Sequence, residues 1–231
     1  MSVTRRWGFS ALAVLGLSIA AHAQAQPVTP PAGTIKLESI RMRDPCVLAD
    51  AASKTYYMIG SAGRSVRAYT STDLTNWQGP QIIFTAPQDI WGDIPIVSIW
   101  APELHVYKGK YYLFLTFDTR HQLAEQWRNW LPRVTRGSQV LAADAPGGPF
   151  RPFQNRSTLP PDMMTLDGTL WVEDGVPYMV FCHEWVQIKD GTVEYIRLKD
   201  DLSATVFATR RDYSTAATPR GAGNRGNTAR T

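Results

Sequence analysis

Two aspartates stand at corresponding places in this 231-residue sequence. Asp44 precedes the apolar run 45–48, and Asp167 precedes the similar run 168–172, so each opens a segment that is typical of a β-strand. An aspartate in such a place is often only a turn residue. Two of them in matching units would bring their carboxylates together, and paired carboxylates are suited to general acid–base chemistry. We therefore treat both as candidate catalytic residues.

Four further polar residues are candidates for the same site. Glu103 and His105 are two residues apart, so on a strand they share one face. His183 and Glu184 end a later apolar run and stand beside a tryptophan. A charged pair at the end of a strand is usually solvated, but the neighbouring aromatic ring raises the interest of this one. We predict that Glu103, His183 and Glu184 contribute to the site.

The elements that must position these side chains form a repeat. Three segments, 44–60, 101–115 and 167–181, each contain an apolar run, a tight turn and a second run rich in aromatic and β-branched residues. This pattern predicts three β-hairpins, and a third strand follows each at 66–74, 138–144 and 193–202. Strand units that recur about every 60 residues predict an all-β fold of the β-propeller type. The alternative is an open sandwich of short strands. Residues 82–100 and 120–136 interrupt the repeat.

The two ends of the chain differ from its body. Residues 1–25 combine two arginines, an apolar run and small residues, which predicts a signal peptide. The run is shorter than the ~20 residues of a membrane span, so we expect a secreted or periplasmic protein without membrane contact after cleavage. Residues 204–231 are basic and poor in large apolar side chains, which predicts a disordered or anomalous tail. We interpret it as an abnormal end from truncation or a frame change, and a basic interaction tail is the alternative.

Charge and cysteine content exclude other classes. The formal net charge is +4, but the excess lies at the two ends, and the body is slightly acidic. Nucleic acid is therefore not an expected partner, because its binding requires a basic face within the fold. Cys46 and Cys182 are too few for a disulfide scaffold and have no metal-binding spacing. They can form one disulfide or remain two buried thiols.

An ordered series of motifs over residues 35–203 resembles glycoside hydrolase family 43. The series consists of Arg43-Asp44-Pro45, Ser71-Thr72-Asp73-Leu74 with Trp77, Trp100-Ala101-Pro102-Glu103-Leu104 with Tyr111-Tyr112, and Asp167-Gly168-Thr169-Leu170. The resemblance implies a five-bladed β-propeller, of which about three blades fit within this chain. It also implies an enzyme that hydrolyses arabinosyl or xylosyl linkages in plant polysaccharide with inversion.

The resemblance assigns roles to the candidate residues. Asp44 is the expected general base, and Asp167 is expected to orient the general acid and tune its pKa. The acid of the family is a glutamate in a later blade, which here would fall in the tail, where the sequence has no Glu. Glu184 is therefore the candidate for a substitute acid. An inverting hydrolase needs its two carboxyl groups roughly 6.5–9.5 Å apart, so that a water fits between them.

Trp100, Glu103 and His183 are expected to contact a polysaccharide or oligosaccharide substrate. Rings at Trp127 and Trp130 could flank a sugar, or could simply fold over the edge of a sheet. The mechanism requires no metal or other cofactor, although some family members hold a calcium ion on the propeller axis. The alternatives to this enzyme are an inactive or carbohydrate-binding propeller, a fragment that lacks the acid, and a sugar hydrolase related to families 32, 62 or 68.

Overall fold

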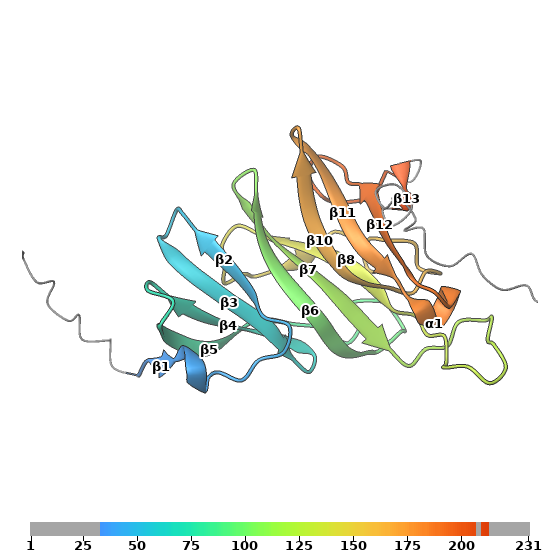
Figure 1. Cartoon of the computed structure of the whole chain (residues 1–231), viewed down its shortest axis with the longest axis horizontal. Coiled ribbons are helices and arrows are strands. Elements are labelled where there is room, and N and C mark those ends of the chain that lie inside the picture. Colours follow the sequence, from blue (N-terminus) through green and yellow to red (C-terminus); the bar gives the residue numbers. More distant parts are fainter. Residues whose placement is uncertain (1–32, 207–208, 213–231) are drawn as a thin grey trace, which may run out of the picture. The chain divides into compact units, whose positions relative to one another are not determined.

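The computed structural model describes residues 33–206 and 209–212. The predicted signal peptide, residues 1–25, lies outside the described residues, as do residues 207–208 and 213–231 of the predicted tail. Within the described residues, three antiparallel sheets follow one another in chain order (Figure 1). The predicted all-β class is confirmed.

The first sheet has the strand order β1-β5-β4-β3-β2. Its strands are β1 (Ile35–Lys36), β2 (Cys46–Asp50), β3 (Thr55–Ala62), β4 (Ser65–Ser71) and β5 (Asn76–Thr85). A short 3-10 helix, η1 (Leu37–Ser39), follows β1. The carboxylate of Asp73 accepts hydrogen bonds from the backbone of Thr75 and Asn76, which fixes the turn from β4 into β5. The strand β5 corrects the predicted interruption at 82–100, because the chain stays in the sheet to residue 85.

The second sheet has the strand order β6-β7-β8-β9. Its strands are β6 (Ile96–Tyr107), β7 (Lys110–Thr119), β8 (Gly137–Ala143) and β9 (Arg151–Pro152). Lys108 and Gly109 both have positive φ angles, 48° and 77°, so they form the two-residue turn that matches the twist of a hairpin. Since β6 begins at residue 96, the segment outside the sheets is only 86–95. The second predicted interruption, 120–136, connects β7 to β8 as expected.

The third sheet has the strand order β10-β11-β12-β13. It contains β10 (Thr165–Glu173), β11 (Val176–His183), β12 (Thr192–Arg197) and β13 (Arg211–Asp212), with the one-turn helix α1 (Trp185–Ile188) between β11 and β12. The strand β13 lies within the predicted tail, so the sheet extends past the expected boundary at residue 203. Its place is fixed by backbone pairing and by Arg210, which donates to the buried carboxylate of Glu194.

The second sheet packs against both of the others. One apolar cluster joins it to the first sheet and includes Ile59, Val66, Phe84, Leu104, Leu113, Leu115, Phe117 and Leu141. A second cluster joins it to the third sheet and includes Tyr112, Phe114, Val140, Met179, Phe181 and Ile196. The edge strand β6 of the middle sheet contacts both β2 and β10, which are edge strands of the other two sheets. This arrangement brings the predicted site residues of three separate repeats together.

Candidate active site

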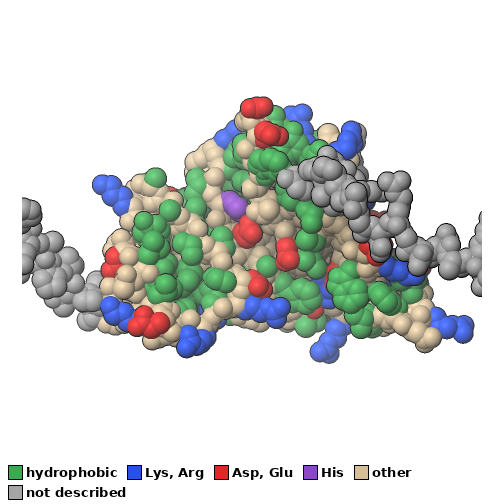
Figure 2. Space-filling model, in the orientation of Figure 1, with side chains coloured by type: hydrophobic (Ala, Val, Ile, Leu, Met, Phe, Trp, Pro, Cys, Tyr) green, Lys and Arg blue, Asp and Glu red, His purple; other side chains and the backbone are tan. Residues whose placement is uncertain are grey.

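One cleft of about 820 Å³ receives side chains from all three sheets. Five of the six predicted site residues line it, namely Asp44, Trp100, Glu103, Asp167 and Glu184. In Figure 2, several acidic side chains and a histidine lie near one another on the face shown, among hydrophobic side chains. Asp44 and Asp167, which the sequence analysis expected to share one site, both line this cleft.

The backbone takes the same unusual conformation at three lining positions. Asp44, Ala101 and Asp167 have φ angles of 47°, 38° and 54°, which is the left-handed region. The ladder between β6 and β7 shifts register from Trp100 to Glu103, and that between β10 and β11 shifts from Leu166 to Thr169. Such irregularities redirect side chains and are common beside functional sites. In each of the three repeats, a residue in the left-handed conformation lines the cleft.

Gly168 allows the close approach of β10 to the middle sheet. A Cβ atom at this position would lie 2.9 Å from the Cβ of Ser138 in β8. The backbone N–H of Asp167 donates to the hydroxyl of Thr116 in β7 at 3.1 Å. The location of the Asp167 carboxylate therefore depends on tight packing between the second and third sheets.

The carboxyl group of Asp167 is surrounded by negative charge. Burial is the main cause that raises its pKa, and the charges of Asp44 and Glu103 raise it further. Like charges in one site disfavour simultaneous ionisation. Both aspartates are exposed, but Asp44 has an ion-pair contact with a positive charge, that of Arg43, at 3.4 Å. Equivalent positions in two repeats thus have different electrostatic environments.

Glu103 forms a pair with His105, as their shared strand face predicted. The Nε2 atom of His105 lies 2.8 Å from Oε2 of Glu103. Burial acts to raise the pKa of Glu103, but hydrogen bonds from His105 and Thr169 outweigh it, so the pKa is lowered. Glu103 therefore keeps a negative charge beside Asp167.

Glu184 is held by an arginine that the sequence analysis did not select. The Nη1 atom of Arg136 lies 2.6 Å from both carboxylate oxygens of Glu184, and its Nε donates to Asp118 at 2.8 Å. The guanidinium group also lies over the ring of Trp100, 4.2 Å from the centroid. Burial raises the pKa of Glu184, and the positive charge of Arg136 opposes this effect.

The sixth predicted residue, His183, is not among the cleft-lining residues. Its side chain is buried, with Nδ1 3.2 Å from the Glu194 carboxylate and Nε2 2.8 Å from the Gln187 amide oxygen. Gln187 in turn accepts from the backbone of Met164. His183 therefore connects α1 to the third sheet, and its position does not support the predicted sugar contact.

The sequence analysis missed Asp118 and Arg136 because neither stands in a motif that the repeats share. Asp118 follows the aromatic run of β7, and Arg136 ends the segment that we regarded only as an interruption. An inward-facing charge at the end of a buried strand was the available signal for Asp118. No spacing rule linked either residue to Glu184, which lies 48 residues from Arg136.

The described residues contain neither a candidate membrane-spanning helix nor a candidate metal-binding cluster. None of the helices in residues 33–206 and 209–212 has the length and apolar character of a membrane span. In the same residues, no group of three or more His, Cys, Asp or Glu side chains is arranged to hold a metal ion. The calcium ion that the resemblance suggested stays a prediction.

Comparison with protein families gives a match over most of the chain. The model of glycosyl hydrolases family 43 matches residues 38–223. An extracellular endo-alpha-(1->5)-L-arabinanase of Bacillus subtilis (strain 168) is 25% identical over 189 residues, which cover 79% of this chain and 53% of that protein. The matched range therefore includes every residue that lines the cleft.

Solved structures show the same similarity. An endo-arabinase from Bacteroides thetaiotaomicron VPI-5482 aligns with a TM-score of 0.64 and 35% identity, covering 75% of this chain and 56% of that one. A thermostable family-43 glycoside hydrolase aligns with a TM-score of 0.54 at 16% identity, covering 70% and 49%, so it shows the fold alone. The chain spans about half the length of the relatives it matches.

Proposed function

Because this chain belongs to glycosyl hydrolases family 43, we propose that it hydrolyses arabinosyl or xylosyl linkages in plant polysaccharide. The observation that carries the proposal is the meeting of Asp44, Asp167 and Glu184 in one cleft. Three carboxyl groups, one from the first repeat and two from the third, satisfy the chemical needs of an inverting glycosidase, which are a base, an acid and a neighbouring charge.

We assign the three roles from the environment of each carboxyl group. Asp44, whose side chain is about half exposed, removes a proton from the attacking water. Glu184 protonates the leaving oxygen, and its buried position keeps the proton available because burial raises the pKa of Glu184. The charge of Asp167 acts in the same direction on that pKa. Trp100 and Glu103 contact the sugar from the second sheet.

The proposal includes the fold and the cellular location. We regard the three sheets as three blades of a five-bladed β-propeller, since their edge strands β2, β6 and β10 adjoin and the sheets pack on one another in chain order. We also propose export to the periplasm or beyond, which the predicted signal peptide supports, as does the extracellular arabinanase among the relatives. The partner is then a polysaccharide or oligosaccharide.

Linear α-(1→5)-arabinan is the first substrate to test, because the Bacillus relative is named for that linkage. The purified chain should release reducing sugar from it, and Asp44→Asn should lower kcat by about 10²–10⁴-fold, as expected for loss of a general base. NMR of the first product should show an inverted anomeric configuration. Retention of configuration, or release of fructose from levan instead of arabinose or xylose, would reject this assignment.

Carbohydrate binding without turnover is a second candidate, and the arginine pair at Glu184 favours it. A carboxylate whose two oxygens both accept from Arg136 is stabilised in its charged form and is a poor proton donor. Under this alternative, the chain would retard on arabinan in affinity electrophoresis and release no sugar. Substituting Glu184→Gln separates the two, because it should abolish turnover in an enzyme and leave binding by a lectin-like protein largely intact.

A further inference from the structure

The rim of the cleft continues onto an aromatic surface. Trp185, in α1, lines the cleft and has 48% of its surface exposed. Trp130, in the connection between β7 and β8, is 39% exposed and packs edge-on against Trp185, with ring centroids 5.7 Å apart and an interplanar angle of 84°. Trp130 is not a cleft-lining residue. It extends the aromatic surface outward from the carboxylates.

The ring of Trp130 is held in a fixed orientation. Its indole N–H donates to the backbone oxygen of Val186 at 2.8 Å, so its polar group is satisfied and its exposed surface is apolar. The connection that carries it is closed by backbone hydrogen bonds between residues 123 and 133 (2.9 Å) and between residues 135 and 121 (2.7 Å). A ring fixed before binding loses little conformational freedom when a ligand packs on it.

Trp127 has a different part in this surface. The Arg133 guanidinium lies 4.7 Å from the centroid of its ring, and the Lys189 ammonium lies 5.1 Å away. Two cations therefore occupy space over this indole, which makes it a support rather than a contact surface. Its ring lies 6.2 Å from that of Trp130 and backs it.

We propose that Trp130, together with Trp185, binds a sugar unit of a polysaccharide chain beyond the units enclosed by the cleft. The proposal rests on the proposed function of the cleft and names its ligand more closely, as a chain of several pentose units. Sugar rings present C–H faces that pack on exposed indoles, and Arg128 and Asn129, both exposed, offer side-chain donors for hydroxyl groups next to Trp130. An exposed, fixed aromatic surface continuous with an acidic cleft fits this ligand.

The test compares long and short substrates. For Trp130→Ala, the ratio of kcat/KM on linear arabinan to kcat/KM on arabinotriose should fall about tenfold, equal to about 1.4 kcal/mol of lost binding. Trp130→Phe should restore part of the ratio, because it keeps a flat aromatic ring, although a smaller one without the N–H donor. Trp171→Ala removes an indole with a similar exposed fraction, 38%, outside the cleft and should keep the wild-type ratio.

Affinity electrophoresis in arabinan gels, with Asp44→Asn in every variant, separates binding from turnover. Weaker retardation for Trp130→Ala than for Trp171→Ala supports the proposal even if the chain hydrolyses nothing, in which case only the proposed function fails. A wild-type ratio and wild-type retardation for Trp130→Ala, in an active enzyme, would overturn the sugar-binding surface and leave the function standing. Absence of both binding and turnover in the wild type would overturn both.

Discussion

The second and third sheets are built from the same hairpin pattern but differ in burial. In β7, the six consecutive residues from Tyr112 to Phe117 are all buried, whereas in β11 buried and partly exposed residues alternate from Val176 to His183. The reason is that β7 has a neighbouring sheet on each face, while β11 has one only on the side of the second sheet among the described residues.

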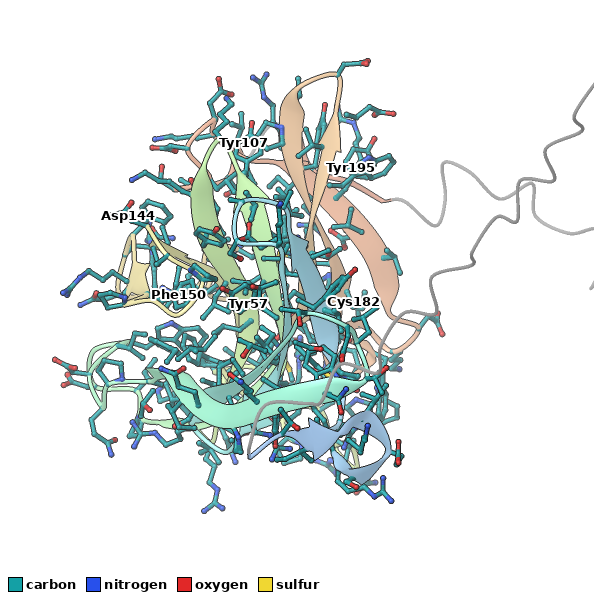
Figure 3. All side chains as sticks on the ribbon, turned by 90° about the vertical axis from the view of Figure 1, so that its left-hand side faces the viewer. Tyr57, Tyr107, Asp144, Phe150, Cys182 and Tyr195 are labelled. Carbon is teal, nitrogen blue, oxygen red and sulfur yellow. The ribbon has the colours of Figure 1, made fainter. Side chains whose placement is uncertain are left out.

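The outer face of the third sheet is nevertheless apolar in composition. It presents Tyr178, Val180 and Cys182 from β11 and Val193 and Tyr195 from β12, of which Cys182 and Tyr195 are labelled in Figure 3. Apolar composition therefore does not distinguish an enclosed strand from a half-enclosed one. The distinction depends on whether a second sheet packs on the other face of the strand. Substitutions on the two sheets can measure the difference in stability.

The largest difference is expected between two aromatic residues. Phe114→Ala removes a fully buried ring between the second and third sheets and should lower the free energy of unfolding by about 3–5 kcal/mol. Tyr178→Ala removes a partly exposed ring from the outer face and should cost only about 1 kcal/mol. Urea unfolding followed by fluorescence measures both. Equal losses would mean that the outer face of the third sheet is as enclosed as the middle one.

A smaller effect is expected at the contact between the two sheets. Gly168→Ala places a Cβ 2.9 Å from that of Ser138, so it should cost about 1–3 kcal/mol and reduce activity by displacing Asp167. Gly147→Ala is the matched control, since nothing lies within 4 Å of its added Cβ. The two variants should separate clearly in thermal melts. A Gly168→Ala variant that melts with the control would show that β10 and β8 are not in close contact.

The cysteines sharpen the same comparison. Both are free thiols, but they are partly exposed and not buried as the second alternative expected. Cys46 packs against the cluster between the first and second sheets, and Cys46→Ser should cost about 1–2 kcal/mol by placing a hydroxyl there. Cys182→Ser, on the outer face of the third sheet, should cost less than about 1 kcal/mol. The reverse order of losses would contradict the assignment of the two faces.

The smallest effect concerns the pH dependence of stability. Because the pKa of Asp167 is raised in the folded chain, the unfolded chain ionises first, and stability falls as the pH rises from the unfolded-state to the folded-state pKa. Asp44→Asn removes one cause of the raised pKa, so it should lower the pKa of Asp167 and make this fall in stability smaller. Carbon-13 NMR titration of Asp167 measures the first effect, and urea unfolding from acid to neutral pH measures the second. An unchanged titration would show that the two carboxylates do not interact.

The sequence predicted the elements that depend on local patterns. Three hairpins and three following strands were found because apolar runs and tight turns specify them, and Lys108-Gly109 is an example of such a turn. The last strands of the second and third sheets were missed for a physical reason. β9 and β13 have two residues each, and backbone pairing with an existing sheet edge holds them, which leaves no apolar pattern to detect.

The site was predictable to the extent that it depends on the repeat. Asp44 and Asp167 were found because equivalent places in stacked units converge. Arg136 could not be found in this way, because it reaches Glu184 across two sheets. His183 was assigned to the cleft from its neighbour Glu184, but His183 ends β11 and contacts Glu194 and Gln187, whereas Glu184 follows the strand and lines the cleft.

The left-handed conformation shared by Asp44, Ala101 and Asp167 bears on how this cleft can change over evolutionary time. Ala101 has the backbone of the two aspartates and lines the same cleft, but it carries only a methyl group. A non-glycine residue in this conformation costs about 1–2 kcal/mol, so the protein maintains the backbone shape there without using it for a functional group. One base change from alanine to aspartate would add a carboxylate to the cleft with no change in the path of the chain. A fold that repeats one backbone conformation in each sheet can therefore acquire new chemistry by single substitutions.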